Sequence, residues 1–313
     1  MHQIKKIKAI FIQNFFRSGG SYLFNQFIDN ENIMGFYEPF HEDLSDLKKI
    51  DVARKEFQKR KKQFNHPNKE FYFQNFPLNK EWFENFHKIN VRLNFFNIKN
   101  QSVSVVQEYL KNLMSYSASF DRLPLFKINR LYLNPEILEL DGVYKIFLLR
   151  EPISTFISNI RLNLLRPYYN KIFQLANEEI EPFKSLWNLV VSNNINNITF
   201  EKEKINFASK KDMEIHYSIF FFIWLFGLYK NFKFDYTFIN YGKLDNLNYS
   251  KKITEEISNN CGVKVKFSNF VKKKDETYDL QIHLNEKIIF LINKFMNREK
   301  IDQILFDNFD ILL

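Results

Sequence analysis

The chain has little of what metal centres and disulfide frameworks require. Its 313 residues include a single cysteine, Cys261, which excludes an intrachain disulfide and any multi-cysteine metal site. The six histidines are scattered along the sequence, and no His-Glu-x-x-His pattern occurs. We therefore expect an activity that does not depend on a bound metal.

Long hydrophobic runs are also missing. The N-terminus has no long apolar core of the kind found in signal peptides, and its first apolar run is predicted to be a strand. The most apolar segment, residues 219–228, has about half the length needed to cross a bilayer, which predicts a buried helix. We expect a cytoplasmic protein that can also make peripheral contact with the inner membrane face.

Glycine and proline are scarce, with 7 and 8 residues, whereas aromatic residues reach 18% and include 37 phenylalanines. We interpret most of these phenylalanines as core residues. A chain of this length with 45% hydrophobic content can bury one α/β core with insertions. We therefore expect a single domain over residues 1–313.

Apolar runs and helical periodicity alternate along the chain, which predicts a mostly parallel sheet flanked by helices. Strands are expected near residues 8–13, 33–37, 124–128, 144–149 and 235–240, and helices near 21–29, 103–117, 152–163, 213–231 and 243–259. Residues 40–100 and 164–210 are expected to be irregular insertions that bind the acceptor. One or two C-terminal helices are expected within residues 280–313.

A short stretch after the first strand has the parts of an anion site: Arg17-Ser18-Gly19-Gly20-Ser21-Tyr22-Leu23. The two glycines let the backbone approach an anion, and the amides of residues 20 to 23 would open a new helix. Ser18 and Ser21 add hydroxyl donors, and Arg17 adds a planar cation. Such a turn is also typical of an ordinary loop and helix cap.

A second stretch, Tyr144-Lys145-Ile146-Phe147-Leu148-Leu149-Arg150-Glu151-Pro152, predicts a buried strand that ends on a cation. The following helix carries Ser158. The triphosphate-binding pattern Gly-x-x-x-x-Gly-Lys-Ser/Thr is absent, and no acidic residue closes the 144–149 strand to hold magnesium. Both observations disfavour magnesium-dependent triphosphate chemistry.

Together these stretches resemble the motifs of sulfotransferases that use 3′-phosphoadenosine 5′-phosphosulfate (PAPS). The first is similar to the family's Lys/Arg-Ser-Gly loop, and Arg150-Glu151-Pro152 with Ser158 is similar to its Arg-x-Pro strand end. The segment Met34-Gly35-Phe36-Tyr37-Glu38-Pro39-Phe40-His41 resembles the Glu-Pro strand end of carbohydrate-type and bacterial members. Weaker similarities at 125–130 and 236–244 extend the resemblance over residues 8–245.

The resemblance implies a P-loop-like sulfotransferase fold and transfer of a sulfuryl group from PAPS to a hydroxyl, with adenosine 3′,5′-bisphosphate (PAP) as product. The acceptor is expected to be a glycan or glycan precursor. The donor-binding residues that it implies are Arg17, Ser18, Gly19, Gly20, Ser21 and Tyr22 at the 5′-phosphosulfate, and Arg150 and Ser158 at the 3′-phosphate. Glu38 is the expected base, His41 is the rival base, and Lys127 is expected to assist at the bridging oxygen.

The chain also departs from the family pattern. Asn14, Phe15 and Phe16 stand where a glycine or proline is usual, and Gly20 replaces a hydroxyl residue. One phosphate contact is therefore expected to be missing. The basic loop that closes over the 3′-phosphate in cytosolic members is not visible, and among the basic runs the segment 272–274 is the candidate substitute.

The net charge of +9 suits an anionic donor or acceptor, and equally a nucleic acid or an acidic membrane face. The densest basic run, residues 54–62, predicts a helix that is either a solvated face or a contact for acidic glycans or membranes. No motif supports specific nucleic-acid recognition. Two alternatives stay open: a kinase-like phosphotransferase, and a basic protein that binds acidic polymers. The sequence leaves the oligomeric state open.

Overall fold

The structure, a computed structural model, describes residues 7–64, 71–89, 103–161, 165–192, 210–265, 267 and 284–309. The chain forms two compact units, and each is described by itself. The first comprises Met1–Leu149 and Phe234–Val271, and the second comprises Arg150–Lys233 and Lys272–Leu313. The expectation of one domain over residues 1–313 stays a prediction.

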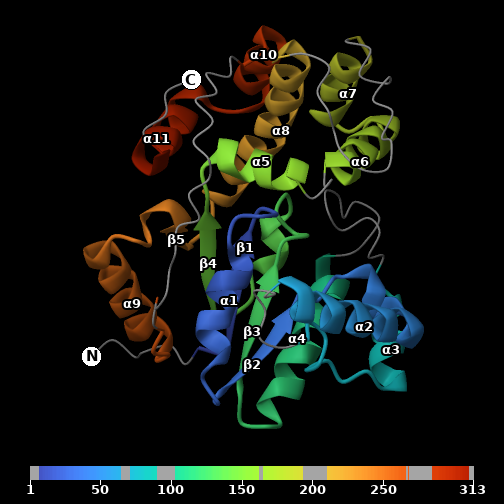
Figure 1. The fold of residues 1–313 in the computed structure, drawn as a ribbon, viewed down its shortest axis with the longest axis vertical. Coiled ribbons are helices and arrows are strands. Elements are labelled where there is room, and N and C mark those ends of the chain that lie inside the picture. The colour runs from blue at the N-terminus through green and yellow to red at the C-terminus, as the bar shows by residue number, and fades with distance from the viewer. Residues whose placement is uncertain are drawn as a thin grey trace. The chain divides into compact units, whose positions relative to one another are not determined.

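The first unit is built on a five-stranded sheet (Figure 1). The strands are β1 (Ala9–Asn14), β2 (Ile33–Tyr37), β3 (Leu123–Ile128), β4 (Val143–Leu149) and β5 (Thr237–Asn240). Their order is β2-β3-β1-β4-β5, and every pairing is parallel. The predicted α/β architecture with a parallel sheet is confirmed, and all five strands lie where the apolar runs predict them.

The central strand β1 is buried at all six positions because helices cover both faces of the sheet. On one face, Phe11 and Phe126 pack in a core with Leu110 of α4 (Val103–Ala118). Residues of α2 (Leu47–Phe64) and α3 (Lys80–His87) join the same core. Ile10 and Ile12 point to the opposite face, because side chains alternate along a strand.

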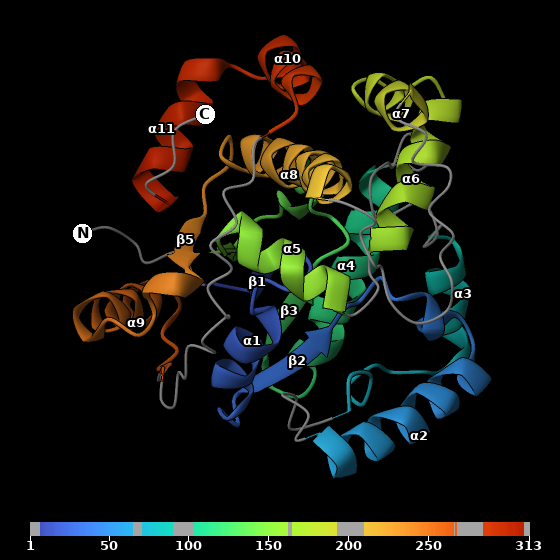
Figure 2. The same ribbon diagram turned by 45° about the horizontal axis from the view of Figure 1, so that its top comes forward.

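On that opposite face the strands pack against α1 (Gly20–Ile28) and α9 (Leu247–Cys261). Figure 2 shows α9 beside β5, and α1 beside β1, the strand that it follows in the chain. Leu23 and Phe27 of α1, and Ile253 and Ile257 of α9, are buried at spacings of four residues. This layering fixes the N-terminus of α1 at the edge of the sheet where β1 ends.

The second unit is helical in its described part. It contains α5 (Pro152–Arg161), α6 (Leu165–Asn177), α7 (Phe183–Ser192), α8 (Lys210–Asn231), α10 (Glu286–Phe295) and α11 (Arg298–Phe309). Residues 215 to 225 of α8 are buried on all sides of the helix, which confirms the predicted buried helix at 219–228. Among the residues described, no helix is long and apolar enough to cross a membrane.

The expectation of irregular structure in 40–100 and 164–210 is wrong for the described parts of these segments. They contain α2, α3, α6 and α7. The aromatic residues there are spaced for helices: Trp82 and Phe86 of α3 lie four residues apart and are both buried. In the tail, α10 and α11 confirm the predicted helices. The helix expected from 243 begins later, at Leu247, after a 3₁₀ turn over Tyr241–Lys243.

Candidate anion-binding and transfer site

The loop between β1 and α1 is held in an unusual backbone conformation. Arg17 has a φ of 67° and Gly19 a φ of 90°, both left-handed. For a residue with a Cβ this conformation is costly, and such strain is typical of functional loops. The amide of Ser18 donates to the carbonyl oxygen of Phe15 at 3.2 Å and closes the turn.

Helix α1 begins on this loop without a side-chain cap. Its N-cap residue is Gly19, which has no side chain to accept a hydrogen bond. The amide of Leu23 makes the first helical bond, to the carbonyl oxygen of Gly19 at 3.2 Å. The amides of the turn before it have no partner within the helix, and they lie at the positive end of the helix dipole. This arrangement favours an anion at the loop.

Ser18 supplies a second, independent sign of a ligand. Its side chain is buried, with 1% of its surface exposed, and its hydroxyl has no hydrogen-bond partner among the described residues. A buried polar group without a partner costs about 1–3 kcal/mol. An oxygen-rich anion bound in the loop would supply the missing acceptor.

The two glycines are required by close packing as well as by conformation. A Cβ on Gly20 would overlap the side chain of Asn14, and a Cβ on Gly19 would overlap the ring of Tyr241. Asn14 is itself fixed, because its side-chain amide donates to the carbonyl oxygen of Phe15 at 2.6 Å. Two departures from the family pattern, Asn14 and Gly20, are thus linked: the asparagine occupies the space that a side chain at position 20 would need.

A charged cluster lies where β2 and β3 end. Glu38 directly follows β2 and is buried, with 4% of its surface exposed. Lys127 of β3 donates to its Oε1 at 2.6 Å, and Arg130 donates to its Oε2 at 3.3 Å. Arg130 also donates to Glu42 at 2.7 Å. Glu38 is therefore a buried carboxylate paired with two cations, and not a solvated loop acid.

The electrostatics of this cluster keep both partners charged. Burial by itself would raise the pKa of Glu38, but the neighbouring Lys127 and Arg130 outweigh it and hold the pKa below its ordinary value. Burial would lower the pKa of Lys127, but Glu38 outweighs that effect and raises it. At neutral pH Glu38 is a carboxylate and Lys127 an ammonium. Glu38 can accept a proton, although with reduced affinity.

His41, the alternative candidate for the base, is hydrogen-bonded within its own loop. Its Nδ1 accepts a hydrogen bond from the backbone amide of Asp43 at 3.2 Å. Burial, with a contribution from Arg130, lowers its pKa, so that it is neutral at neutral pH. Because Nδ1 is the acceptor, the neutral ring carries its proton on Nε2. This arrangement makes His41 the weaker candidate of the two.

Tyr37 connects the anion loop, here defined as residues 15–21 between the end of β1 and the first turn of α1, to the charged cluster. Its hydroxyl lies 2.5 Å from that of Ser21, and the Nζ of Lys127 lies 4.2 Å from the centre of its ring. The structure thus brings Ser21, Lys127 and Glu38 together through one aromatic residue. Sequence reasoning missed Tyr37, although its place beside Glu38 at a strand end was a usable signal. It also gave no role to Arg130, which lies in the strand-end motif.

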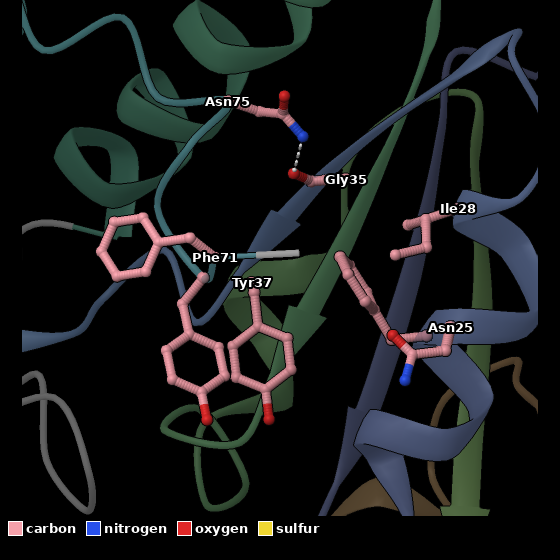
Figure 3. A pocket seen from close by; sticks show the side chains of 8 residues that line it. Asn25, Ile28, Gly35, Tyr37, Phe71 and Asn75 are labelled. Atoms are coloured by element: carbon pink, nitrogen blue, oxygen red, sulfur yellow. Dashed lines mark hydrogen bonds between the residues drawn. The ribbon is translucent and has the colours of Figure 1, made fainter. Parts of the chain in front are cut away.

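A small cavity lies behind Tyr37 and is lined by Phe71 and by Asn25 and Ile28 of α1 (Figure 3). Asn75 reaches across to donate to the carbonyl oxygen of Gly35 at 2.9 Å. The cavity volume is about 10 Å³, enough for roughly one water molecule. It is a small packing gap beside the end of β2 and is not a substrate pocket.

Arg150 and Ser158 belong to the second unit. Arg150 follows Leu149, the last residue of β4, and both predicted phosphate ligands are half-buried. Glu151 caps α5 by accepting from the amides of Ile153 at 2.8 Å and Ser154 at 2.7 Å. That Arg150 and Ser158 bind the same nucleotide as the loop between β1 and α1 stays a prediction. The basic segment 272–274 lies outside the described residues.

No cluster of three or more metal-ligating side chains occurs among the described residues. No protein-family model matches the chain, and no curated protein matches it. Among solved structures, the chain is similar to the sulfotransferase domain of the Synechococcus PCC 7002 olefin synthase. The similarity covers 94% of this chain and 96% of that one, with 13% identity and a TM-score of 0.40. A similarity at this level establishes neither family nor activity.

Proposed function

We propose that this protein is a sulfotransferase that moves a sulfuryl group from PAPS to a hydroxyl of a carbohydrate acceptor. The observation that carries the proposal is one connected site in the first unit. An uncapped helix start with the buried, unpartnered Ser18 hydroxyl is joined through Tyr37 to the Lys127–Glu38 pair. Sulfuryl transfer needs these two parts: donors for an anionic leaving group, and a base beside the acceptor.

The residues of the loop fit the donor. The backbone at Gly19 and Gly20, the hydroxyls of Ser18 and Ser21, and the cation of Arg17 would hold the 5′-phosphosulfate oxygens. PAPS supplies the sulfuryl group and leaves as PAP. Like phosphoryl transfer, the reaction passes through a loose transition state, in which the protein mainly positions groups and stabilises charge.

The charged cluster supplies the acceptor side. In the proposal, Glu38 accepts the proton of the attacking hydroxyl, and its ionised state at neutral pH is the state that a base requires. Its lowered proton affinity is tolerable, because a loose transition state demands little activation of the nucleophile. Lys127, held beside Glu38 and over Tyr37, would stabilise charge at the bridging oxygen.

The deciding experiment is thermal stabilisation by PAP, compared with AMP and ATP, with and without magnesium at fixed salt. We expect a shift with PAP that is independent of magnesium; at a ligand concentration of about 100 times Kd it corresponds to about 2.7 kcal/mol. Incubation with PAPS and candidate glycans would then identify the acceptor. No shift with PAP, or a shift that requires ATP and magnesium, would remove the sulfotransferase proposal and favour a phosphotransferase.

A further inference from the structure

Helix α2 presents a strongly basic face that the transfer site does not use. Among the side chains described on this helix, residues 47 to 59, the exposed cations outnumber the exposed acids, Asp51 and Glu56. The cations, here called the α2 basic face, are Lys48, Lys49, Arg54, Lys55 and Lys59. From Lys48 to Lys59 the face extends along about 16 Å of helix.

The cations of the α2 basic face are not buried against the rest of the first unit. The helix is anchored by Ile50, Ala53 and Phe57, which are spaced at three and four residues and turned toward the protein core. In the part of the chain that the structure describes, Lys48, Lys55 and Lys59 form no ion pair. A row of exposed, mutually repelling cations lowers stability, and an anionic ligand would offset that cost.

A chain of aromatic contacts links this helix to the transfer site. The guanidinium of Arg54 lies 5.2 Å from the ring centre of Phe71, and Phe57 lies edge-on to Tyr72 at 5.2 Å. Tyr72 lies 4.8 Å from Tyr37, the residue that contacts both the anion loop and Lys127. Figure 3 shows Phe71 and Tyr37 among the side chains that line the small cavity. The buried side of α2 is therefore packed against the aromatic residues that surround Tyr37.

A second connection runs through the loop that follows Glu38. Helix α2 packs against the 3₁₀ turn Glu42–Ser45, and Lys49 donates to the hydroxyl of Ser45 at 3.3 Å. Glu42 in the same turn accepts from Arg130, which also contacts Glu38. One end of the α2 basic face is thus connected, within the first unit, to the charged cluster around Glu38.

From this geometry we infer that the α2 basic face binds an acidic polysaccharide, which is the chain that carries the acceptor hydroxyl. The inference rests on the proposed function and adds the class of acceptor and the surface that holds it. A linear polyanion matches the face because its charges repeat along one direction and stay solvated, as do the lysines. The contacts would act by charge and would weaken with salt.

Two other polyanionic partners fit the face less well. A helix that binds in a membrane interface exposes a broad apolar face, whereas Ile50 and Phe57 of α2 are buried in the protein. The large apolar side chains exposed on the described part of α2 are Leu47 and Val52, which lie about 140° apart around the helix axis and form no such face. Single-stranded nucleic acid is held largely by stacking on exposed aromatic rings, and Phe57 is not exposed. The observations therefore favour a polysaccharide.

The test compares two triple variants of the full chain. In one, Lys48, Lys55 and Lys59 are replaced by glutamine; in the matched control, the exposed Lys243, Lys251 and Lys252 near and on α9 are replaced in the same way. Binding to polygalacturonate, neutral dextran, an oligouridylate and phosphatidylglycerol vesicles is measured at several salt concentrations. PAP-induced stabilisation is measured on the same samples.

We expect the wild type and the control to bind polygalacturonate, with affinity falling as salt rises, and not to bind dextran. The α2 variant should bind at least about tenfold more weakly, if each lost charge contributes about 0.5 kcal/mol. Equal losses in both variants, no binding to polygalacturonate, or tighter binding to vesicles or oligouridylate would overturn the inference. If PAP still stabilises the wild type when the inference fails, the proposed function stands. If PAP does not stabilise the wild type, the proposed function fails, whatever the polysaccharide result.

Discussion

At the scale of single residues, stability and function are separable in the anion loop. The hydroxyl of Ser18 is buried without a partner, so it costs stability in the ligand-free protein. Ser18→Ala is therefore expected to leave the free energy of unfolding unchanged or to raise it by up to about 1 kcal/mol. The same variant should bind PAP about tenfold more weakly, because one hydrogen bond to a charged oxygen is lost. A fall in stability without a change in PAP affinity would contradict the assignment.

Unlike Ser18, Lys127 and Glu38 are expected to be needed for stability, because each carries the charge that compensates the other in the protein interior. Lys127→Met leaves the buried Glu38 with Arg130 as its remaining cation and is expected to cost about 3–5 kcal/mol in urea unfolding. The double variant with Glu38→Gln should cost less than the sum of the two single changes, because no uncompensated charge then remains. Additive costs would show that the two side chains do not interact.

The lowered pKa of Glu38 gives the pair a pH signature. A carboxyl whose pKa falls on folding adds stability that is complete above its unfolded pKa, about 4.3, and is lost as the pH falls through the lower folded value. The stability difference between the wild type and Glu38→Gln should thus be constant near neutral pH and shrink below about pH 4.3. A difference that persists unchanged to pH 2 would exclude Glu38 as its source.

At the scale of elements, apolar runs located the strands, because a parallel sheet covered on both faces needs continuous apolar sequence. The Gly-Gly turn after β1 correctly marked the start of α1. Sequence reasoning predicted a helix over 54–62, which lies within α2, but it missed α3, because its charged and aromatic residues masked a helical spacing such as that of Trp82 and Phe86. It also missed the role of Tyr37, which depends on a contact between Ser21 and a residue 16 positions away.

The packing of the anion loop predicts a sharp steric response at Gly20. Gly20→Ala would place a methyl group onto the Asn14 side chain, and we expect reduced stability and weakened PAP binding. Replacing Asn14 by alanine in the same chain makes room and should restore a large part of both. Gly242→Ala serves as the matched control, since its Cβ would lie 3.3 Å from its nearest neighbour, the side chain of Asn240. Failure of the double variant to recover would refute the steric explanation.

At the scale of the whole molecule, the sequence predicts donor-binding residues in each of the two units. The anion loop lies in the first unit, whereas Arg150, directly after the last residue of β4, and Ser158 of α5 lie in the second. The sequence joined them in one prediction through the resemblance of both stretches to sulfotransferase motifs. That prediction concerns a nucleotide with two separated phosphate groups, so it can be tested with two ligands that differ at one of them.

Arg150→Ala is expected to weaken binding of PAP about tenfold to a hundredfold, since one charge-assisted contact to the 3′-phosphate contributes about 1.5–3 kcal/mol. Binding of adenosine 5′-phosphosulfate, which lacks that phosphate, should be nearly unchanged. Calorimetric titration of both ligands measures the difference, with Arg161→Ala at the exposed end of the same helix α5 as control. Equal weakening of the two ligands would separate Arg150 from the 3′-phosphate and leave the anion loop of the first unit as the remaining part of the donor site.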